Sequence, residues 1–313
     1  MMNRWRQGAL LFAKGMTMGA ADVVPGVSGG TMALITGVYD RLLESLSRID
    51  GHAVGLLLKG RVVDLWRHVD GTFLVTLFGG VLLSILSLAR LITHLLQAYP
   101  VLVWSFFFGL ILISALYVGR SLDRWTPTAG GMLLLGAAFA WMITAAHPLQ
   151  LQPDTPTLFI AGAIAVCAMI LPGISGSFIL LLMGLYAPVL TAINSFDLAV
   201  LATVAAGCVV GLLSFSRVLN WLLHHHHRAT LAFLCGLMLG SLNKVWPWKE
   251  TLSVRENSAG ELVPLLQRNL LPDQYETLLG QGAQLGESLG LMLLGMVLVW
   301  LITRMAGGSD TES

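Results

Sequence analysis

The chain has 313 residues, of which 56% are hydrophobic and 11% charged, and its formal net charge is +1. Soluble domains carry about 25% charged residues, so this composition predicts a polytopic membrane protein. A charge near zero, with no basic stripe interleaved with aromatic residues, excludes a nucleic-acid partner. The three cysteines lie in apolar segments, which argues against a disulfide framework or a metal cluster. They are Cys167, Cys208 and Cys235.

The first predicted element is a re-entrant helical hairpin over residues 9–47. About 15 apolar residues lie on each side of the motif PGVSGGT, a length that suits half-helices rather than spans. Pro25 lacks a backbone N–H and Gly26 tolerates positive φ, so we expect an irregular turn at the tip. Irregular backbone at membrane depth must line a cavity or be buried in protein, because lipid cannot satisfy its polar groups.

Residues 50–70 are too charged to span, and we expect them to lie along the cytoplasmic membrane surface. Three predicted transmembrane helices follow, at 71–98, 101–118 and 128–146, each long enough to cross the apolar layer. Together with the hairpin they form a first unit, residues 1–147.

A second unit, residues 148–313, repeats this order. Its elements are a hairpin over 157–190 around PGISGSF, spans at 199–223, 229–246 and 287–305, and an extracytoplasmic loop at 247–286. The sequence therefore predicts an all-α membrane protein.

Three aligned blocks relate the two units. The PG motifs align at an offset of 147 (172 minus 25), and Arg90 aligns with Arg217 at an offset of 127 (217 minus 90). The run GMLLLGAAFAWMIT from Gly131 aligns with GLMLLGMVLVWLIT from Gly290 at an offset of 159 (290 minus 131). Because a hairpin adds no crossing and each unit has three spans, the units are predicted to be inverted repeats.

The distribution of basic residues predicts the orientation. The side that holds the N-terminus carries most of them, and the other side carries only Lys249, Arg255 and Arg268. The positive-inside rule then places both termini in the cytoplasm. The basic residues counted on the N-terminal side are Arg4, Arg6, Arg41, Arg48, Lys59, Arg61, Arg67, Arg120, Arg124, Arg228 and Arg304.

Arg90 and Arg217 are the candidate ligands for an anion. A guanidinium within a span costs about 2.5 to 3.5 kcal/mol on insertion scales. Each arginine either snorkels to the nearest interface or binds a ligand. The second alternative is a matched pair of phosphate ligands, one for each access state, because the guanidinium presents a fork of donors that suits phosphate oxygens.

The motif tips offer complementary donors. Their hydroxyls and glycine N–H groups, at the positive end of a helical arm, suit an anion, although small residues also serve close helix packing. The predicted binding residues are Ser28, Gly29, Gly30, Thr31, Ser175, Gly176 and Ser177. The predicted hinge residues are Pro25, Gly26, Pro172 and Gly173.

Lys14 and Asp22 are the other ionisable residues predicted at membrane depth. Asp22 either couples transport to an ion such as a proton or pairs with Lys14 or an arginine. Sodium is the other coupling ion that the sequence leaves open. No metal or other cofactor is expected, and the run His224 to His227 favours a cytoplasmic loop over a metal site.

The tips PGVSGGT and PGISGS, with the lead-in AADVVPGVSGGT, resemble those of the PopT family of bacterial polyprenyl-phosphate transporters, over about residues 8–305. The resemblance implies a secondary transporter that moves undecaprenyl phosphate from the outer to the inner leaflet of the bacterial cytoplasmic membrane, where the carrier is reused for peptidoglycan precursors. No GxxxxGK[ST] motif is visible, so an ion or substrate gradient would drive it. A homodimer is among the assemblies left open.

Two alternatives remain. Undecaprenyl-diphosphate phosphatases also have inverted repeats with re-entrant hairpins, and their tips read PGxSRS. In this chain Gly29 and Gly176 stand in the place of that arginine, and no ExxxE pair precedes either tip. The general acid and the nucleophile of a phosphatase therefore lack candidates. The other alternative, a scaffold that only organises partners, would not require charges at matched depths.

Overall fold

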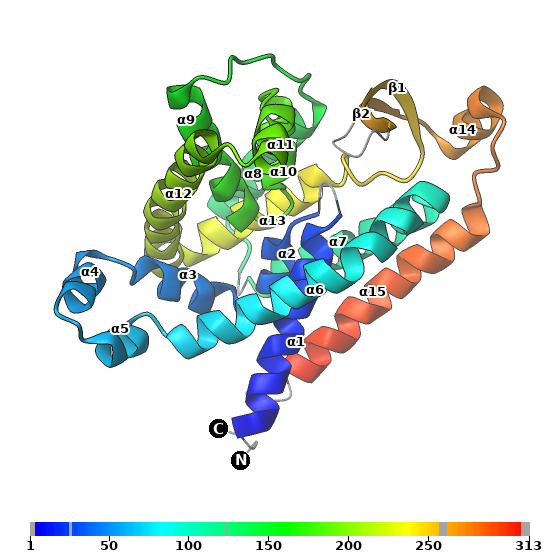
Figure 1. The fold of residues 1–313 in the computed structure, drawn as a ribbon. Helices are drawn as coiled ribbons and strands as arrows, with labels where there is room; N and C mark the ends of the chain where they lie inside the picture. The colour runs from blue at the N-terminus through cyan, green and yellow to red at the C-terminus, as the bar shows by residue number, and fades with distance from the viewer. Residues whose placement is uncertain (1–3, 25–26, 123, 257–261, 308–313) are drawn as a thin grey trace.

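The computed structural model describes residues 4–24, 27–122, 124–256 and 262–307, and it is nearly all helical (Figure 1). The helices of the first half are α1 (Arg4–Asp22), α2 (Gly29–Ile35), α3 (Tyr39–Ser47), α4 (Gly51–Leu58), α5 (Val62–His68), α6 (Gly71–Ala98), α7 (Pro100–Arg120) and α8 (Pro127–Ala145). The second half has α9 (Thr155–Ile170), α10 (Gly176–Leu182), α11 (Tyr186–Ser195), α12 (Leu198–His225), α13 (His227–Ser241), β1 (Lys249–Glu256), β2 (Leu262–Asn269), α14 (Pro272–Leu279) and α15 (Leu285–Gly307).

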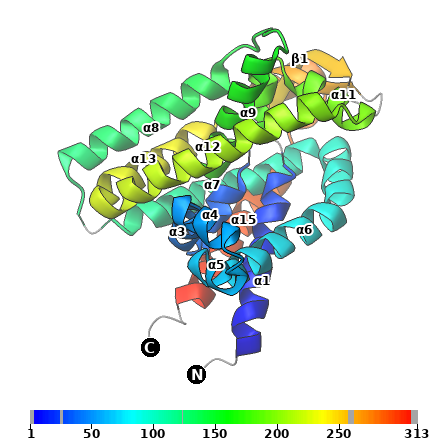
Figure 2. The ribbon, with the colours of Figure 1, turned by 60° about the vertical axis from the view of Figure 1, so that its left-hand side comes forward.

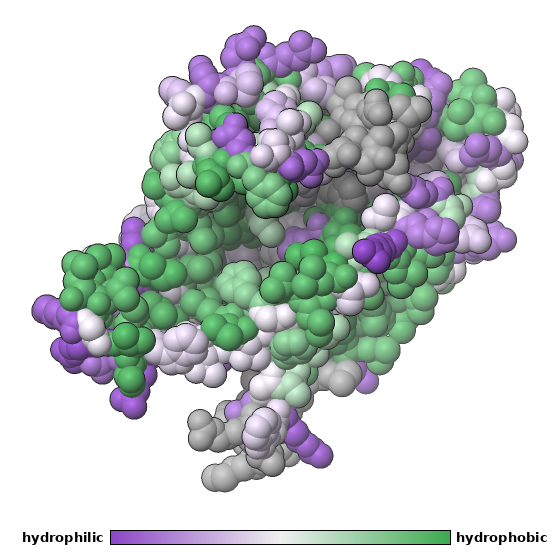
Figure 3. All heavy atoms as spheres, viewed as in Figure 1, coloured by the Kyte–Doolittle hydropathy of each residue, from purple (hydrophilic) through white to green (hydrophobic). Residues whose placement is uncertain are grey.

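Five of the described helices are long and apolar enough to cross a membrane: α6, α7, α8, α12 and α15. Large apolar side chains on them face outward, such as Leu86 on α6 and Leu134 on α8, which are 72% and 68% exposed. Apolar residues cover much of the face seen in Figure 3, polar residues gather at its upper and right-hand edges, and the surface over α4 and α5 carries both kinds. Such a belt suits contact with lipid, so the chain is a polytopic membrane protein.

Helix α13 and the loop after it differ from the sequence-based expectation. Helix α13 ends at Ser241, before the predicted 246, and it is not among the helices long enough to span. The expectation of an all-α protein was wrong, because β1 and β2 pair as an antiparallel sheet within the predicted loop. Buried Trp248 fixes this sheet by donating its indole N–H to the carbonyl of Ala283 at 2.9 Å.

Each hairpin has a returning arm that is broken in two. Gly37 separates α2 from α3 and Gly184 separates α10 from α11, with φ of 71° and 74°. Only glycine adopts this region readily, so the position of the glycine determines where the returning arm breaks. Helices α10 and α11 are bent by 110° relative to each other. The returning arms are thus pairs of short helices rather than single half-helices.

The outgoing arm of each hairpin packs along the first long helix that follows it, α1 on α6 and α9 on α12. Glycine permits both contacts. Gly80 of α6 lies against the backbone carbonyl of Phe12, and Gly207 of α12 lies against that of Phe159. A methyl group at either glycine would overlap that carbonyl oxygen, so the helices approach at backbone distance.

The remaining long helices pair across the two halves of the chain. Helix α8 packs on α13, and α15 packs on α7 (Figures 1 and 2). Glycines again allow the approach: Gly236 meets the carbonyl of Leu133, and Gly109 meets that of Met292. One continuous apolar core therefore joins both halves, and the two hairpins meet within it.

Candidate functional site

The tips of the two hairpins contact each other. Ser28, the N-cap of α2, donates its hydroxyl to the carbonyls of Met169 and Leu171 at 3.0 and 3.1 Å, and Tyr39 donates to that of Ile170 at 3.2 Å. These carbonyls end helix α9, where they lack partners within the helix. The first hairpin therefore caps the outgoing arm of the second.

A second set of contacts closes the junction. Thr31, which is fully buried, accepts the backbone N–H of Gly173 at 3.0 Å. Gly30 lies so close to the carbonyl of Ile170 that any side chain there would overlap it. Gly173 has φ of 86°, which places the chain after Pro172 in a turn that favours glycine. Of the predicted hinge residues, Pro25 and Gly26 lie outside the described residues.

The two ionisable residues of α1 hold the two ends of α2. Asp22 accepts the backbone N–H of Gly29 at 2.7 Å, and Lys14 donates to the carbonyl of Thr36 at 2.7 Å. Lys14 and Asp22 are eight positions apart, which is about 12 Å along a helix. This distance is close to the length of the seven-residue α2, about 10 Å. The carboxylate is at the positive end of α2 and the ammonium at its negative end, so both charges interact favourably with the helix dipole.

The tip of the second hairpin is built differently. Ser175 is the N-cap of α10 but makes no capping bond, and its hydroxyl instead contacts that of Ser177 at 2.9 Å. Ser177 is exposed, whereas Gly176 packs against the carbonyl of Ala165. No carboxylate takes the place that Asp22 has in the first hairpin, since Met169 stands at the aligned position.

The two repeat-aligned arginines are exposed and have different surroundings. Arg217 of α12 donates to the carbonyl of Ile49 at 2.6 Å and to that of Ser47 at 3.4 Å. It thereby binds the C-terminal end of α3, where a cation is favoured. Arg90 of α6 has no hydrogen bond or ion pair to any residue within the described ranges.

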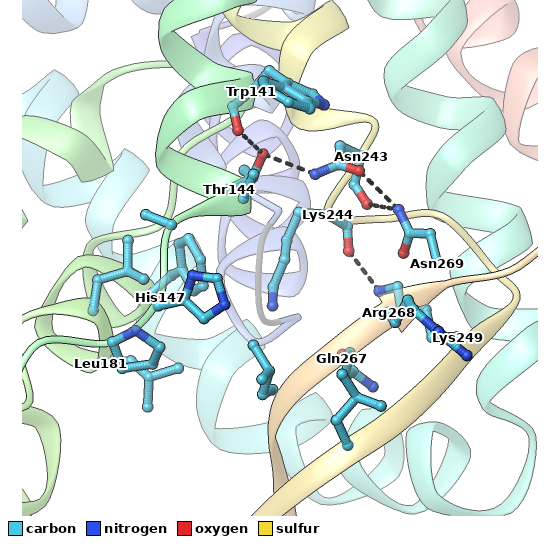
Figure 4. A pocket seen from close by; sticks show the side chains of 17 residues that line it. Trp141, Thr144, His147, Leu181, Asn243, Lys244, Lys249, Gln267, Arg268 and Asn269 are labelled. Carbon is cyan, nitrogen blue, oxygen red and sulfur yellow. Dashed lines mark hydrogen bonds between the residues drawn. The ribbon is translucent and has the colours of Figure 1, made fainter.

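A cavity of about 320 Å³ lies beside the second hairpin, and the sequence interpretation did not single it out (Figure 4). Its wall is formed by the end of α8, by Phe178 and Leu181 of α10, and by side chains within 243–252 and 266–269. The Lys244 side chain extends into it, and its ammonium lies 4.6 Å from the centre of the Phe178 ring. The cavity thus borders the tip motif that contains Ser177.

Lys249 supplies a second ammonium to this cavity. It donates to the carbonyl of Lys244 at 2.5 Å and lies 3.9 Å from the centre of the Trp104 ring. Burial, together with the charge of Lys244, holds the pKa of Lys249 well below its usual range, and burial also lowers the pKa of Lys244. The signal available in the sequence was the presence of two lysines, five positions apart, around the end of the span predicted for residues 229–246.

The histidine run forms local contacts. The His224 and His225 rings lie within hydrogen-bond distance of the carbonyls of Asn220 and Trp221, one turn earlier in α12. Within the described ranges, no group of three or more His, Cys, Asp or Glu side chains is arranged to hold a metal ion. The cysteine thiols contact backbone carbonyls, as that of Cys235 does with Ala115.

A family model described as undecaprenyl phosphate translocase-like matches residues 18–263. The chain belongs to this family. It is 54% identical over 288 residues to a polyprenyl-phosphate transporter of Vibrio cholerae, an alignment that covers 92% of this chain and 94% of the relative. It is 34% identical over 252 residues to a polyprenyl-phosphate transporter of Staphylococcus aureus, covering 75% and 84% of the two chains. No solved structure matches.

Membership of the translocase-like family confirms the resemblance seen in the tip motifs. Both relatives are named as transporters, so the chain is a membrane transporter rather than an enzyme. The phosphatase and scaffold alternatives find no support among these relatives. The roles of the individual site residues stay predictions.

Proposed function

We propose that this translocase-like protein moves undecaprenyl phosphate from the outer to the inner leaflet of the bacterial cytoplasmic membrane, by alternating access between two inverted repeats. The names of the two relatives support a polyprenyl phosphate as the substrate. The isoprenoid tail stays in lipid while the phosphate passes along the hairpin junction, so the protein supplies polar partners only to the headgroup.

Equivalent contacts in the two halves support the repeat. The offsets of 147 and 127 map the contact between Gly80 and Phe12 onto that between Gly207 and Phe159. The offsets of 127 and 159 likewise map Gly109 with Met292 onto Gly236 with Leu133. A chance resemblance between apolar helices would not reproduce their contacts. Each half has three helices after its hairpin if α13, which is shorter than a span, is counted with α12 and α15, and an odd number of crossings favours opposite orientations of the two units.

One departure from this symmetry carries the proposal. Helix α3 packs against α12, but its counterpart α11 makes no comparable contact with α6 in the described part of the chain. The α4–α5 segment and the described ends near both termini lie toward the lower left of Figure 1, opposite the β1–β2 sheet. With the cytoplasm on the α4–α5 side, the α3–α12 contact closes the route from the hairpin junction to the cytoplasm. The route from the junction to the extracytoplasmic side, next to α11, is open.

The arginines follow the same asymmetry. Arg217 holds the closed contact through the carbonyls of Ser47 and Ile49, while Arg90 is free to bind phosphate. The repeat places Asn194 and Phe196 at the positions that correspond to Ser47 and Ile49. In the inward-facing state we expect Arg90 to bind those two carbonyls and Arg217 to be released to the substrate.

Asp22 supplies a route for proton coupling within this scheme. Its bond to the N–H of Gly29 ties α1 to α2, and protonation of the carboxylate would weaken that bond. Ser28 and Thr31 would then leave their partners on the second hairpin and become available to the phosphate. Sodium coupling is the competing scheme, and an experiment with separate ion gradients distinguishes the two.

Reconstitution into liposomes tests the proposal. A fluorescent short-chain polyprenyl phosphate in the outer leaflet is protected from a membrane-impermeant quencher once it reaches the inner leaflet. We expect wild-type protein to move the probe, and Arg90→Ala and Arg217→Ala to abolish movement while still inserting. Arg61→Ala is the matched control, since this arginine pairs with Asp64 on the α4–α5 surface at 2.7 Å. Absence of movement by wild-type protein, or release of phosphate from undecaprenyl diphosphate, would overturn the proposal.

A further inference from the structure

The cavity beside the second hairpin holds a positive charge that its surroundings do not balance. Neither Lys244 nor Lys249 pairs with a carboxylate in the ranges that the structure describes. Arg268 also lines the cavity, but it is already bound to Glu250 at 2.7 Å. Two ammonium groups therefore line the same space, and among the described residues their partners are aromatic rings and a carbonyl.

Such an arrangement is costly unless an anion completes it. Removing an ammonium from water costs free energy that contact with an aromatic ring only partly offsets. The lowered pKa of both lysines reflects this cost. Replacing either lysine by an apolar residue would relieve it, so the fold gains nothing from the charges by themselves. Charge that the protein does not balance itself points to a ligand of opposite sign.

We propose that the cavity between Lys244 and Lys249 binds a phosphate monoester, the headgroup of the transported lipid, before it reaches the hairpin junction. This inference rests on the proposed function and names a loading site on the extracytoplasmic side. A monoester dianion matches two ammonium groups in charge. Gln267 also lines the cavity and provides an amide donor, whereas the amides of Asn243 and Asn269 already donate to partners within the protein.

The apolar wall of the cavity gives the isoprenoid tail a path. Phe178, Leu181 and Leu182 of α10 line the side next to the second hairpin. Phe178 follows Ser177 directly and carries the ring against which Lys244 rests. A headgroup held by the lysines thus lies beside Phe178, the residue that follows Ser177 of the tip. Neutralising Lys244 would also loosen its contact with α10, the element that has to move.

Hydrogen bonds among side-chain amides hold the segment that carries Lys244 in place and do not involve the lysine ammonium groups. Asn269 donates its side-chain amide to both the carbonyl and the side-chain oxygen of Asn243 at 2.8 Å. Asn243 in turn donates to Thr144 at the end of α8, at 3.3 Å. The segment that carries Lys244 is therefore fixed to β2 and to α8, and the two ammonium groups are presented on a rigid frame.

Binding to the full chain in detergent tests the site. The probes are farnesyl phosphate, farnesol and inorganic phosphate, and calorimetry measures their affinities. We expect farnesyl phosphate to bind, and Lys249→Met and Lys244→Gln each to weaken it about tenfold. Lys244→Arg should retain most of the affinity. Lys59→Gln, on the α4–α5 surface, is the matched control. Binding by inorganic phosphate alone would identify a free-phosphate site instead of a lipid site and would overturn the proposal.

Chemical protection gives a readout that depends on the site itself. Reductive methylation followed by mass spectrometry should modify Lys244 and Lys249 in the free protein. Farnesyl phosphate should protect both of them and leave Lys59 reactive. Equal modification with and without the probe would refute the assignment of the cavity.

Transport by the same variants separates this inference from the proposed function. If wild-type protein moves the fluorescent probe and Lys249→Met moves it equally well, the cavity is not a loading site although the protein is a transporter. If wild-type protein moves nothing, yet both lysines are protected and both variants lose affinity, the binding site stands and the transport proposal fails.

Discussion

The bond between Asp22 and α2 permits a quantitative test of ion coupling. The Asp22 carboxylate accepts the N–H of Gly29 at 2.7 Å and is half-buried. A hydrogen bond to a charged group contributes about 1.5 to 3 kcal/mol. A helix of seven residues has no stability of its own, so α2 depends on such contacts. Asp22→Asn keeps an acceptor oxygen and should cost about 1 kcal/mol, whereas Asp22→Ala should cost about 2 to 3 kcal/mol.

Thermal unfolding in detergent measures these differences in stability. Asp154→Asn is the matched control, because Asp154 caps α9 by accepting the N–H of Thr157 at 2.9 Å. Asn and Asp are equally good N-caps, so this change should alter the free energy of unfolding by less than about 0.5 kcal/mol. An Asp22→Asn protein as stable as wild type would refute the argument that the carboxylate holds α2.

Transport under imposed gradients tests the coupling role. Asn at position 22 resembles the protonated carboxyl group, so Asp22→Asn should still equilibrate the fluorescent lipid but lose its response to a pH gradient. A sodium gradient should have no effect on wild-type protein or on the variant. If Asp22→Asn kept the wild-type response to a pH gradient, Asp22 would not be the coupling residue. A response of wild-type protein to sodium alone would favour the competing scheme.

Three further predictions concern helix packing, the closed contact and the lysine cavity. Gly207→Ala should lower the free energy of unfolding by more than about 1 kcal/mol because its methyl group overlaps a carbonyl of α9, whereas Gly130→Ala, with open space around it, should be neutral or stabilising in the same thermal assay. Arg217→Gln should increase labelling of a cysteine placed at Asn220 from the cytoplasmic side, since it loses two bonds to the end of α3; unchanged labelling would contradict its role as a latch. Raising the pH should weaken farnesyl phosphate binding at a lower pH than that at which an ordinary lysine loses its proton, because burial holds the pKa of Lys249 well below its usual range, whereas the monoester, with a second pKa of about 6, stays a dianion. His147 and Arg268, the latter paired with Glu250, are the other basic side chains that line the cavity, and a flat pH profile would contradict the lysine site.

Local sequence signals predicted much of the architecture. The long apolar runs became helices with nearly the expected bounds, since α6 covers residues 71–98 as predicted. The breaks at Gly37 and Gly184 could have been expected, because these glycines align at the offset of 147 and glycine tolerates the positive φ that both adopt. The sheet formed by β1 and β2 was missed, because its strands depend on contacts such as that of Trp248 with Ala283, which are distant in sequence.

The candidate site was less predictable. Ser28 and Thr31 were expected to face an anion, yet in this state their partners are backbone groups of the other hairpin, more than 140 residues away. Asp22 was expected either to bind an ion or to pair with a cation, and it accepts a backbone N–H of its own hairpin. Hydrogen-bonding groups such as these suit several partners, and only the approach of the two tips selects among them.

The sequence by itself determined that this chain is a polytopic membrane protein and to which family it belongs, and it predicted that the two halves repeat. Those properties depend on composition, spacing and identity, which a linear pattern carries. The tertiary structure decided that Arg217 binds the end of α3 whereas Arg90 has no partner in the described part of the chain, and it brought Lys244 and Lys249 into one cavity with the second hairpin. Elements far apart in the chain form that cavity, so its charge balance exists only once they are packed together.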